Sequence, residues 1–318
     1  MEEQYKPDNN RRRWIKAGLG FLALSAVSTP ELFASEARRN KRLSVLHTND
    51  WHSRIDPFPQ NDPKFPGQGG AARRATLVEQ IRAEDGEVLL LDAGDIVQGT
   101  PYFNYYAGKP EIELMNLMRY DAATLGNHDF DNGIEGLKKM LSWARFPFVN
   151  CNYGWGDTKL DQWVKPSVIV RKGGLKIGIL GVGIELGPLL PAENIKGIQY
   201  YDPIQKANLE AFKLKKEKGC DLVICLSHLG YSYTDSKVSD RVLASQSRNI
   251  DAILGGHTHT FLEKPEVSLN LEGNSVIINQ VGWAGLRLGR VNWQFSSSNN
   301  TNNKASAQIE DFKKSIAI

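Results

Sequence analysis

The stretch TLGNHDFDNG, residues 124–133, holds an amide, an imidazole and two carboxylates within the five residues that follow Gly126. These side chains belong to Asn127, His128, Asp129 and Asp131, and they directly follow the apolar run AATL (122–125). A core segment would not carry so many polar groups, and a surface turn needs only the glycines. The stretch is therefore typical of a functional site, at which these groups are held together for chemistry.

Four more clusters of the same kind occur along the chain. They are TNDWHS (48–53), LDAGDIVQG (91–99), LSHLG (226–230) and GGHTHT (255–260). The protein has 6 histidines, and all but His47 lie in one of the five clusters. His47 itself stands three residues before Asp50. A random scatter of histidines would not give this distribution, so the clusters are interpreted as one site.

Short β-branched runs alternate with helical patterns around these clusters. Strands are expected at 43–48, 87–94, 146–152, 175–182, 221–228, 251–256, 275–282 and 288–295. Helices are expected at 69–85, 111–120, 133–144 and 202–219. Several strands are apolar throughout, as when both faces of a sheet are covered. The alternation predicts an α/β sandwich formed by a single domain at about 43–295, followed by a polar linker or tail at 296–318.

Each cluster follows an apolar strand, where α/β folds place their sites. Asp50 and His52 are two residues apart, as are His257 and His259, so each pair would project to one face if strand geometry persists. Imidazole nitrogens with carboxylate and amide oxygens suit Zn, Mn, Fe, Co or Ni. Candidate ligands exceed what one tetrahedral ion needs and fit two metal ions; they are Asp50, His52, Asp95, Asn127, His228, His257 and His259.

Each cluster taken alone has an ordinary structural explanation. GNHD can be a capped turn, and GD after a strand is common in turns. The combination, in this order and always behind an apolar strand, favours a metal site instead.

The five clusters resemble, in order and wording, the motif set of calcineurin-like metallophosphoesterases. They are most similar to the catalytic N-terminal domain of bacterial 5′-nucleotidases and UDP-sugar hydrolases, and the resemblance covers nearly all of residues 43–295. It implies a four-layer α/β/β/α sandwich with a centre of two divalent metal ions between the two sheets.

The resemblance also implies the role of each residue. One metal ion would be held by Asp50, His52 and His259. The other would be held by Asn127, His228 and His257, with Asp95 bridging the two ions. His128 matches the family's catalytic histidine and Asp131 its carboxylate partner, while Asn127 and His128 would contact the substrate. The nucleophile would be a metal-bound hydroxide.

Three other polar residues near the clusters receive no such role. Asp92 matches no ligand position and is interpreted as a supporting or structural residue. His47 is interpreted in the same way. Asp129 is expected to cap its turn.

The implied function is that of a phosphomonoesterase that releases phosphate from nucleotides. The alternatives are a cyclic-nucleotide phosphodiesterase, a related hydrolase of sulfur esters, and a non-catalytic metal-binding subunit of a two-chain nucleotidase. Two-domain nucleotidases continue into a domain that grips the nucleoside, whereas this chain stops soon after residue 295. A separate chain is therefore a possible source of that domain.

The N-terminus predicts export. Arg11, Arg12 and Arg13 precede an apolar run at 17–27, which is too short for a membrane span and suits a signal peptide. The arginine pair resembles a twin-arginine signal, and SEA, ending at Ala37, offers a cleavage site. The mature chain would then be periplasmic or otherwise exported, without a transmembrane span. Its small net charge, +3 for the full chain, argues against nucleic acid as a partner and against a DNA nuclease.

The three cysteines add little to this picture. Cys220 and Cys225 are five residues apart and would face opposite sides of a strand. No pair has metal-ligand spacing. Buried thiols are expected, with one disulfide left open.

Overall fold

The computed structural model describes residues 40–296 and 308–309, and Arg42–Gln294 packs as one compact unit. The expected signal peptide, residues 1–37, lies outside the described residues. So does the expected tail, apart from Ser296 and the short strand Gln308–Ile309.

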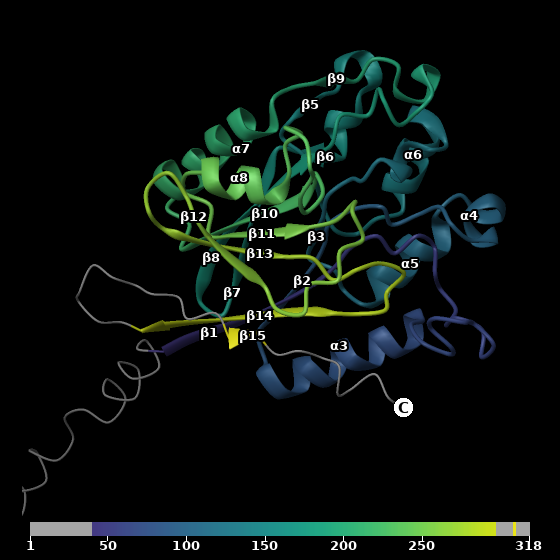
Figure 1. Ribbon diagram of the computed structural model, residues 1–318, viewed down its shortest axis with the longest axis horizontal. Helices are drawn as coiled ribbons and strands as arrows, with labels where there is room; N and C mark the ends of the chain where they lie inside the picture. The colour runs from purple at the N-terminus through teal and green to yellow at the C-terminus, as the bar shows by residue number, and fades with distance from the viewer. Residues whose placement is uncertain (1–39, 297–307, 310–318) are drawn as a thin grey trace, which may run out of the picture. The chain divides into compact units, whose positions relative to one another are not determined.

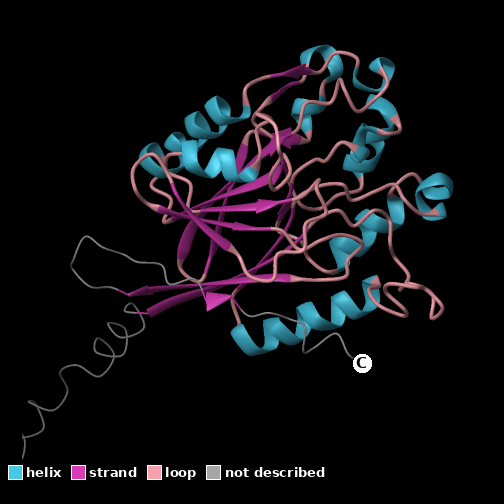
Figure 2. Cartoon of the chain, in the orientation of Figure 1, coloured by secondary structure: helices cyan, strands magenta, loops and turns pink. Residues whose placement is uncertain are grey.

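Two large sheets dominate the fold (Figure 2). The first has the strand order β15 (Gln308–Ile309), β14 (Gly289–Ser296), β1 (Asn40–Thr48), β2 (Val88–Asp92), β3 (Ala122–Ala123), β4 (Phe148–Val149) and β6 (Val164–Lys165). The second has the order β12 (Glu266–Leu269), β13 (Ser275–Asn279), β11 (Ala252–Gly255), β10 (Leu222–His228), β8 (Leu175–Gly183) and β7 (Ser167–Lys172). A small third sheet pairs β5 (Tyr153–Gly154) with β9 (Gln199–Tyr200).

Helices cover the outer face of each large sheet (Figure 1). They are α3 (Ala71–Asp85), α4 (Pro101–Tyr106), α5 (Lys109–Leu117), α6 (Gly133–Ser142), α7 (Pro203–Phe212), which continues as a π-helix at Lys213–Glu217, and α8 (Asp240–Gln246). Apolar side chains of α3, α5 and α6 share one buried core with β1 and β2 of the first sheet. Those of α7 and α8 share another core with β8, β10, β11 and β13 of the second sheet.

The two large sheets approach each other at Gly181 of β8. A Cβ atom there would lie 2.1 Å from the Val149 carbonyl oxygen and 2.7 Å from the Thr124 hydroxyl. The Cys151 N–H also donates to the Gly181 carbonyl at 2.8 Å. Helices, sheet, sheet and helices thus form the four-layer α/β/β/α sandwich that the sequence predicted.

The long apolar strands and the main helices lie where the sequence predicted them. Other strands and α-helices were not expected, namely β3, β5, β6, β7, β9, β12, β15, α4 and α8. The expected strand 146–152 is regular only at Phe148–Val149. The expected helix 202–219 is α-helical only to Phe212, and the chain continues from Lys213 to Glu217 as the π-helix. All three cysteines are free thiols, and Cys220 and Cys225 are buried as expected.

Parallel pairing brings the candidate site together. β1, β2 and β3 run parallel in the first sheet, and β8, β10 and β11 run parallel in the second. The five polar clusters lie at the carboxyl ends of β1, β2, β3, β10 and β11.

Within the described part of the chain, no helix has the length and apolar character that crossing a bilayer requires.

Candidate metal centre

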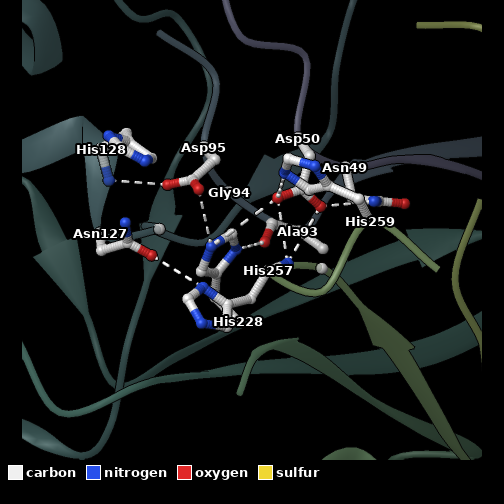
Figure 3. A network of polar contacts seen from close by, with 12 residues as sticks. Asn49, Asp50, Ala93, Gly94, Asp95, Asn127, His128, His228, His257 and His259 are labelled. Carbon is white, nitrogen blue, oxygen red and sulfur yellow. Dashed lines mark hydrogen bonds and ion pairs between the residues drawn. The ribbon is translucent and has the colours of Figure 1, made fainter. Parts of the chain in front are cut away.

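The candidate ligands gather into two neighbouring groups between the two large sheets (Figure 3). One group consists of Asp50, His52 and His259, and the other of Asp95, His228 and His257. Within each group, the potential ligand atoms all lie within 4.8 Å of one another. Residues far apart in the sequence thus converge, as expected for clusters that follow the strands of an α/β fold.

Asp95 lies within reach of both groups. Its Oδ2 is 3.1 Å from Nε2 of His228 in its own group and 3.9 Å from Nε2 of His52 in the other. The second carboxylate, Asp50, has Oδ1 at 3.3 Å from Nε2 of His259 and at 4.0 Å from Nε2 of His228. A carboxylate within reach of both groups has the position that a bridging ligand needs.

Asn127 joins the second group through its side-chain oxygen. Its Oδ1 lies 2.9 Å from Nδ1 of His257, and the next residue, His128, donates its backbone N–H to Asp95 Oδ1 at 2.8 Å. The loop that follows β3 is therefore tied directly to the carboxylate between the two groups.

His228 is oriented as a metal ligand would be. Its Nδ1 lies 2.7 Å from the Ala93 carbonyl oxygen, which can only accept, so Nδ1 carries a proton. Its Nε2 is buried, points toward Asp95, and has no hydrogen-bond partner. A histidine that donates from one nitrogen to a carbonyl and leaves the other for a metal is the usual arrangement in metalloproteins.

The backbone is left-handed at most of these positions. Asp50, His52, Asp95, His257 and His259 have φ values of 51°, 52°, 55°, 76° and 51°. The expectation that strand geometry would persist through the Asp50–His52 and His257–His259 pairs was therefore wrong. His257 and His259 instead point to different groups, because each turns out of a tight loop rather than along a strand.

Electric charge in the centre calls for a cation. Burial lowers the pKa of His257 to about 4, which favours the neutral ring that a metal needs. Burial also opposes charge on His228, yet the carboxylates of Asp95 and Asp50 raise its pKa to about 10. Burial also disfavours the charged form of Asp95, but nearby His228 holds the pKa of Asp95 below its usual range. The carboxylates of Asp50 and Asp95 are both fully buried, so they need positive charge beside them.

These observations test whether the residues fit divalent metal ions. The donor set combines imidazole nitrogen with carboxylate and amide oxygen, which suits first-row transition metals. The buried Nε2 of His228 lacks a hydrogen-bond partner, and metal ions would supply the charge that Asp50 and Asp95 demand. The residues fit such ions, and two candidate sites are present.

His128 and Asp131 lie beside the two groups and belong to neither. Nδ1 of His128 is 2.9 Å from Oδ2 of Asp131, and the His128 side chain is 36 % exposed. This hydrogen bond raises the pKa of His128 against the opposing effect of burial. A 3₁₀ turn at His128–Phe130 sets the three-residue spacing. Asp131 thus engages Nδ1, while the ring stays partly exposed beside the two groups.

Asp129 does more than cap its own turn. Its carboxylate accepts the backbone N–H groups of Gly126, Asp95 and Ile96 at 2.8, 3.1 and 3.0 Å. Burial, and the nearby charge of Asp95, raise the pKa of Asp129 to about 7. Asp129 thus connects the loop after β3 to the loop after β2, and it fixes the position of Asn127 relative to Asp95.

His47 and Asp92 stand outside the two groups, as expected. His47 is fully buried and receives a hydrogen bond from Asn279 at 2.8 Å, and burial lowers its pKa to about 3. Asp92 accepts from the Thr48 hydroxyl at 2.6 Å and from the Gly94 N–H at 2.9 Å. His47 thus connects β1 to the end of β13, and Asp92 connects the ends of β1 and β2.

Two amides that the sequence did not single out also support the ligands. Asn49 donates to Asp50 Oδ2 at 2.6 Å and accepts the Val281 N–H at 3.1 Å. Gln280 is bonded to the loop that carries His257 and His259. The position of Asn49 directly before Asp50 was a usable signal, whereas Gln280 lies in a strand-like run with no chemical signature.

Comparison with known proteins agrees with the geometry. A family model described as calcineurin-like phosphoesterase matches residues 43–261. The snake venom 5′-nucleotidase of Naja atra is 35% identical over 273 residues, which cover 80% of this chain and 50% of that protein. The 5′-nucleotidase of Homo sapiens is 34% identical over 302 residues, with 88% and 50% coverage. The chain thus spans about half the length of the curated relatives that it matches.

A solved structure gives the same result at the level of the fold. The 5′-nucleotidase precursor from Thermus thermophilus superimposes with a TM-score of 0.72 and 31% sequence identity. The match covers 84% of this chain and 54% of that chain.

Proposed function

Since the chain belongs to the calcineurin-like phosphoesterase family of metal-dependent phosphoester hydrolases, we propose that it is a 5′-nucleotidase-type phosphomonoesterase that releases phosphate from nucleotides. The observation that carries this proposal is the His128–Asp131 pair, which is partly exposed beside two groups of candidate metal-binding side chains. The relatives named as 5′-nucleotidases support the choice of a nucleotide as substrate.

The proposed ligands are those expected from the sequence. Asp50, His52 and His259 would hold one ion, and Asn127, His228 and His257 would hold the other, with Asp95 within reach of both groups. When bound, divalent ions such as Zn²⁺, Mn²⁺, Fe²⁺ or Co²⁺ make water nucleophilic near neutral pH and neutralise charge on the phosphoryl oxygens. The Asn127 amide N–H₂ donates to a phosphoryl oxygen and helps to orient the substrate.

His128 handles the proton of the leaving group. Asp131 accepts from Nδ1 at 2.9 Å and favours the protonated ring, so Nε2–H faces the substrate. As water oxygen bonds to phosphorus, the bond between phosphorus and the 5′ oxygen breaks, and Nε2 gives its proton to that oxygen. The products are inorganic phosphate and a nucleoside, and the ring regains a proton from the attacking water.

Phosphate release from 5′-AMP tests the proposal. The full chain is assayed with Mn²⁺, Zn²⁺ or Co²⁺, beside an aryl phosphate, a cyclic nucleotide and a bis-aryl phosphate. We expect metal-dependent hydrolysis of 5′-AMP, and a loss of about 10²–10⁴-fold in kcat for His128→Asn if the ring acts as general acid. Metal content should be unchanged in that variant, because His128 binds no ion.

The other substrates separate the alternatives. Cleavage of the diesters faster than of 5′-AMP would replace the nucleotidase proposal with a phosphodiesterase. Cleavage of aryl phosphate alone would mean that nucleotide recognition needs a further domain. Metal binding without any turnover would favour the non-catalytic subunit.

We also propose that the protein is exported, which the arginine pair and the apolar run of the N-terminus support. The venom relative fits this proposal. Replacing Arg11 and Arg12 by lysine should leave the protein in the cytoplasm of a bacterial host, as measured by cell fractionation. The second chain expected from the sequence stays a prediction, which co-purification would test.

A further inference from the structure

Gln280 lies directly behind the loop that carries two of the candidate ligands. It follows β13, which pairs in parallel with β11, and the loop 256–260 leaves the neighbouring end of β11. Its side chain is fully buried. The sequence motifs assign no role to this residue, and its amide oxygen is engaged by the Thr258 hydroxyl and the Thr260 N–H.

The Gln280 amide makes three hydrogen bonds to this loop. Nε2 donates to the Gly256 carbonyl at 2.6 Å, and Oε1 accepts from the Thr258 hydroxyl at 3.0 Å and from the Thr260 N–H at 2.5 Å. The bonded residues therefore alternate with His257 and His259. One amide holds the loop on its inner side while the two histidines project toward the centre.

The loop needs such an anchor because of its backbone conformation. His257 and His259 have φ values of 76° and 51°, in the left-handed region that non-glycine residues avoid. Such conformations persist only where the surroundings fix them. Asp50 contributes from the opposite side, since both of its carboxylate oxygens lie 3.0 Å from the His257 N–H.

The same contacts connect the loop to the rest of the centre. The Thr258 hydroxyl also accepts the Tyr231 N–H at 2.9 Å, which ties in the loop that follows His228. The neighbour of Gln280, Val281, donates its N–H to Asn49, which in turn donates to Asp50. Gln280 and its neighbour Val281 thus contact residues that hold ligands of both groups in place.

We propose that Gln280 is a positioning residue that fixes the spacing between the two metal sites. It acts through the residues that flank His257, which belongs to the Asp95 group, and His259, which belongs to the Asp50 group. The proposal rests on the proposed function only in requiring that these histidines bind metal. It assigns Gln280 no contact with metal or substrate.

Binding of Mn²⁺ to the full chain tests the proposal. Gln280→Met keeps much of the buried volume and removes all three hydrogen bonds. We expect its affinity for Mn²⁺ to fall by about 10–100-fold, which is usual when a residue that supports a metal ligand is lost. Equilibrium dialysis with elemental analysis, corrected for the folded fraction, measures this affinity. In the Mn²⁺-loaded protein, the electron paramagnetic resonance signal of coupled ions should weaken.

A matched control separates positioning from general stability. Asn270 is another buried amide, whose Oδ1 accepts the Glu272 and Asn274 N–H groups at 2.9 and 3.0 Å in the turn between β12 and β13. Asn270→Ala should lower the melting temperature and leave Mn²⁺ affinity unchanged. An equal loss of affinity in this control would overturn the proposal.

The remaining outcomes are also decisive. Wild-type affinity and an unchanged coupled signal in folded Gln280→Met would overturn the proposal. If that variant does not fold, Thr258→Val decides, because it removes a Gln280 partner at a less buried position. Several-fold weaker Mn²⁺ binding in this variant supports the positioning role of Gln280, and unchanged binding overturns it.

A wild-type protein that binds no Mn²⁺ would overturn both this inference and the proposed function, whereas one that binds Mn²⁺ without hydrolysing 5′-AMP would overturn only the function.

Discussion

At the scale of single residues, the centre combines strained backbone with buried charge. Asp50, His52 and Asp95 share the left-handed conformation with the two histidines of the GGHTHT loop. Each such residue costs roughly 1–2 kcal/mol relative to its usual conformation. Hydrogen bonds between the loops offset that cost, including those from three backbone N–H groups to Asp129. The site is therefore held by its neighbours and does not form from local preference.

The residues of the site differed in how far the sequence revealed them. The candidate ligands and His128 carry groups whose chemistry is unusual after an apolar strand, so they were predicted. Gln280 was not, because an amide at a strand end has no distinctive chemistry until its partners are known. The carboxylate of Asp129 joins two loops that are distant in the chain, since it accepts the N–H of Asp95, 34 residues earlier. No local pattern encodes such a contact.

Asp131→Asn should change the pH dependence of hydrolysis. The hydrogen bond from His128 to Asp131 raises the pKa of His128, and activity that needs the protonated ring falls as pH rises through that pKa. Without the carboxylate this pKa drops, so the fall should move to lower pH. The kcat/KM for 5′-AMP across pH 5–9 measures the shift. Profiles that coincide after scaling would contradict a role for Asp131 in tuning the ring.

Asp240→Asn should change how stability depends on pH. Burial raises the pKa of Asp240 to about 8, and its Oδ2 has no hydrogen-bond partner. The folded state therefore binds a proton that the unfolded state releases near pH 4. As pH rises from about 4 to 8, this group lowers the free energy of unfolding by at most about 1.4 kcal/mol per pH unit.

The asparagine variant lacks this proton, so its stability should decline less over that range. Urea denaturation at several pH values, with EDTA in every sample, gives the comparison. Parallel curves for the two proteins would show that Asp240 is ionised in the folded state at neutral pH.

At the scale of elements, the strands that are buried on both faces were predicted from the sequence, whereas most of the partly exposed and very short strands were not. β8 and β10 are almost wholly buried and were predicted from their continuous apolar runs. β7 and β12 are edge strands with alternating partial exposure, and they lack such a run. β3 has only 2 residues, so nothing local distinguishes it from a loop, although its partner β2 makes it part of the sheet. The short β3 nonetheless positions Asn127 and His128.

Gly181→Ala should weaken the contact between the two sheets. The added methyl group would meet the Val149 carbonyl at 2.1 Å, and that backbone atom cannot move without shifting β4. We expect a loss of about 1–3 kcal/mol in the free energy of unfolding, measured by urea denaturation. Gly187→Ala is the control, since an added Cβ there meets nothing within 4 Å. It should stay within about 0.5 kcal/mol of the wild type.

At the scale of the whole molecule, two sheets with separate cores share one polar centre. Asp50 and Asp95 come from the first sheet, and His228, His257 and His259 come from the second. Any ion bound between them joins the two halves of the sandwich directly. The four-layer arrangement was predictable because the resemblance covered both halves, but the balance of charge at their junction emerged only from the buried positions of the carboxylates.

Removal of metal should therefore lower the stability of the whole fold. An ion present at about 100 times its dissociation constant stabilises the folded state by about 2.7 kcal/mol per site. For a domain of this size, that corresponds to a rise of roughly 5–10 °C in melting temperature. Differential scanning calorimetry in Mn²⁺ and in EDTA measures the difference. Asp95→Asn should abolish most of it, while Asp161→Asn, at an exposed position, should retain it. A melting temperature that is equal in Mn²⁺ and EDTA would mean that no ion links the two sheets, and it would contradict the proposed metal centre.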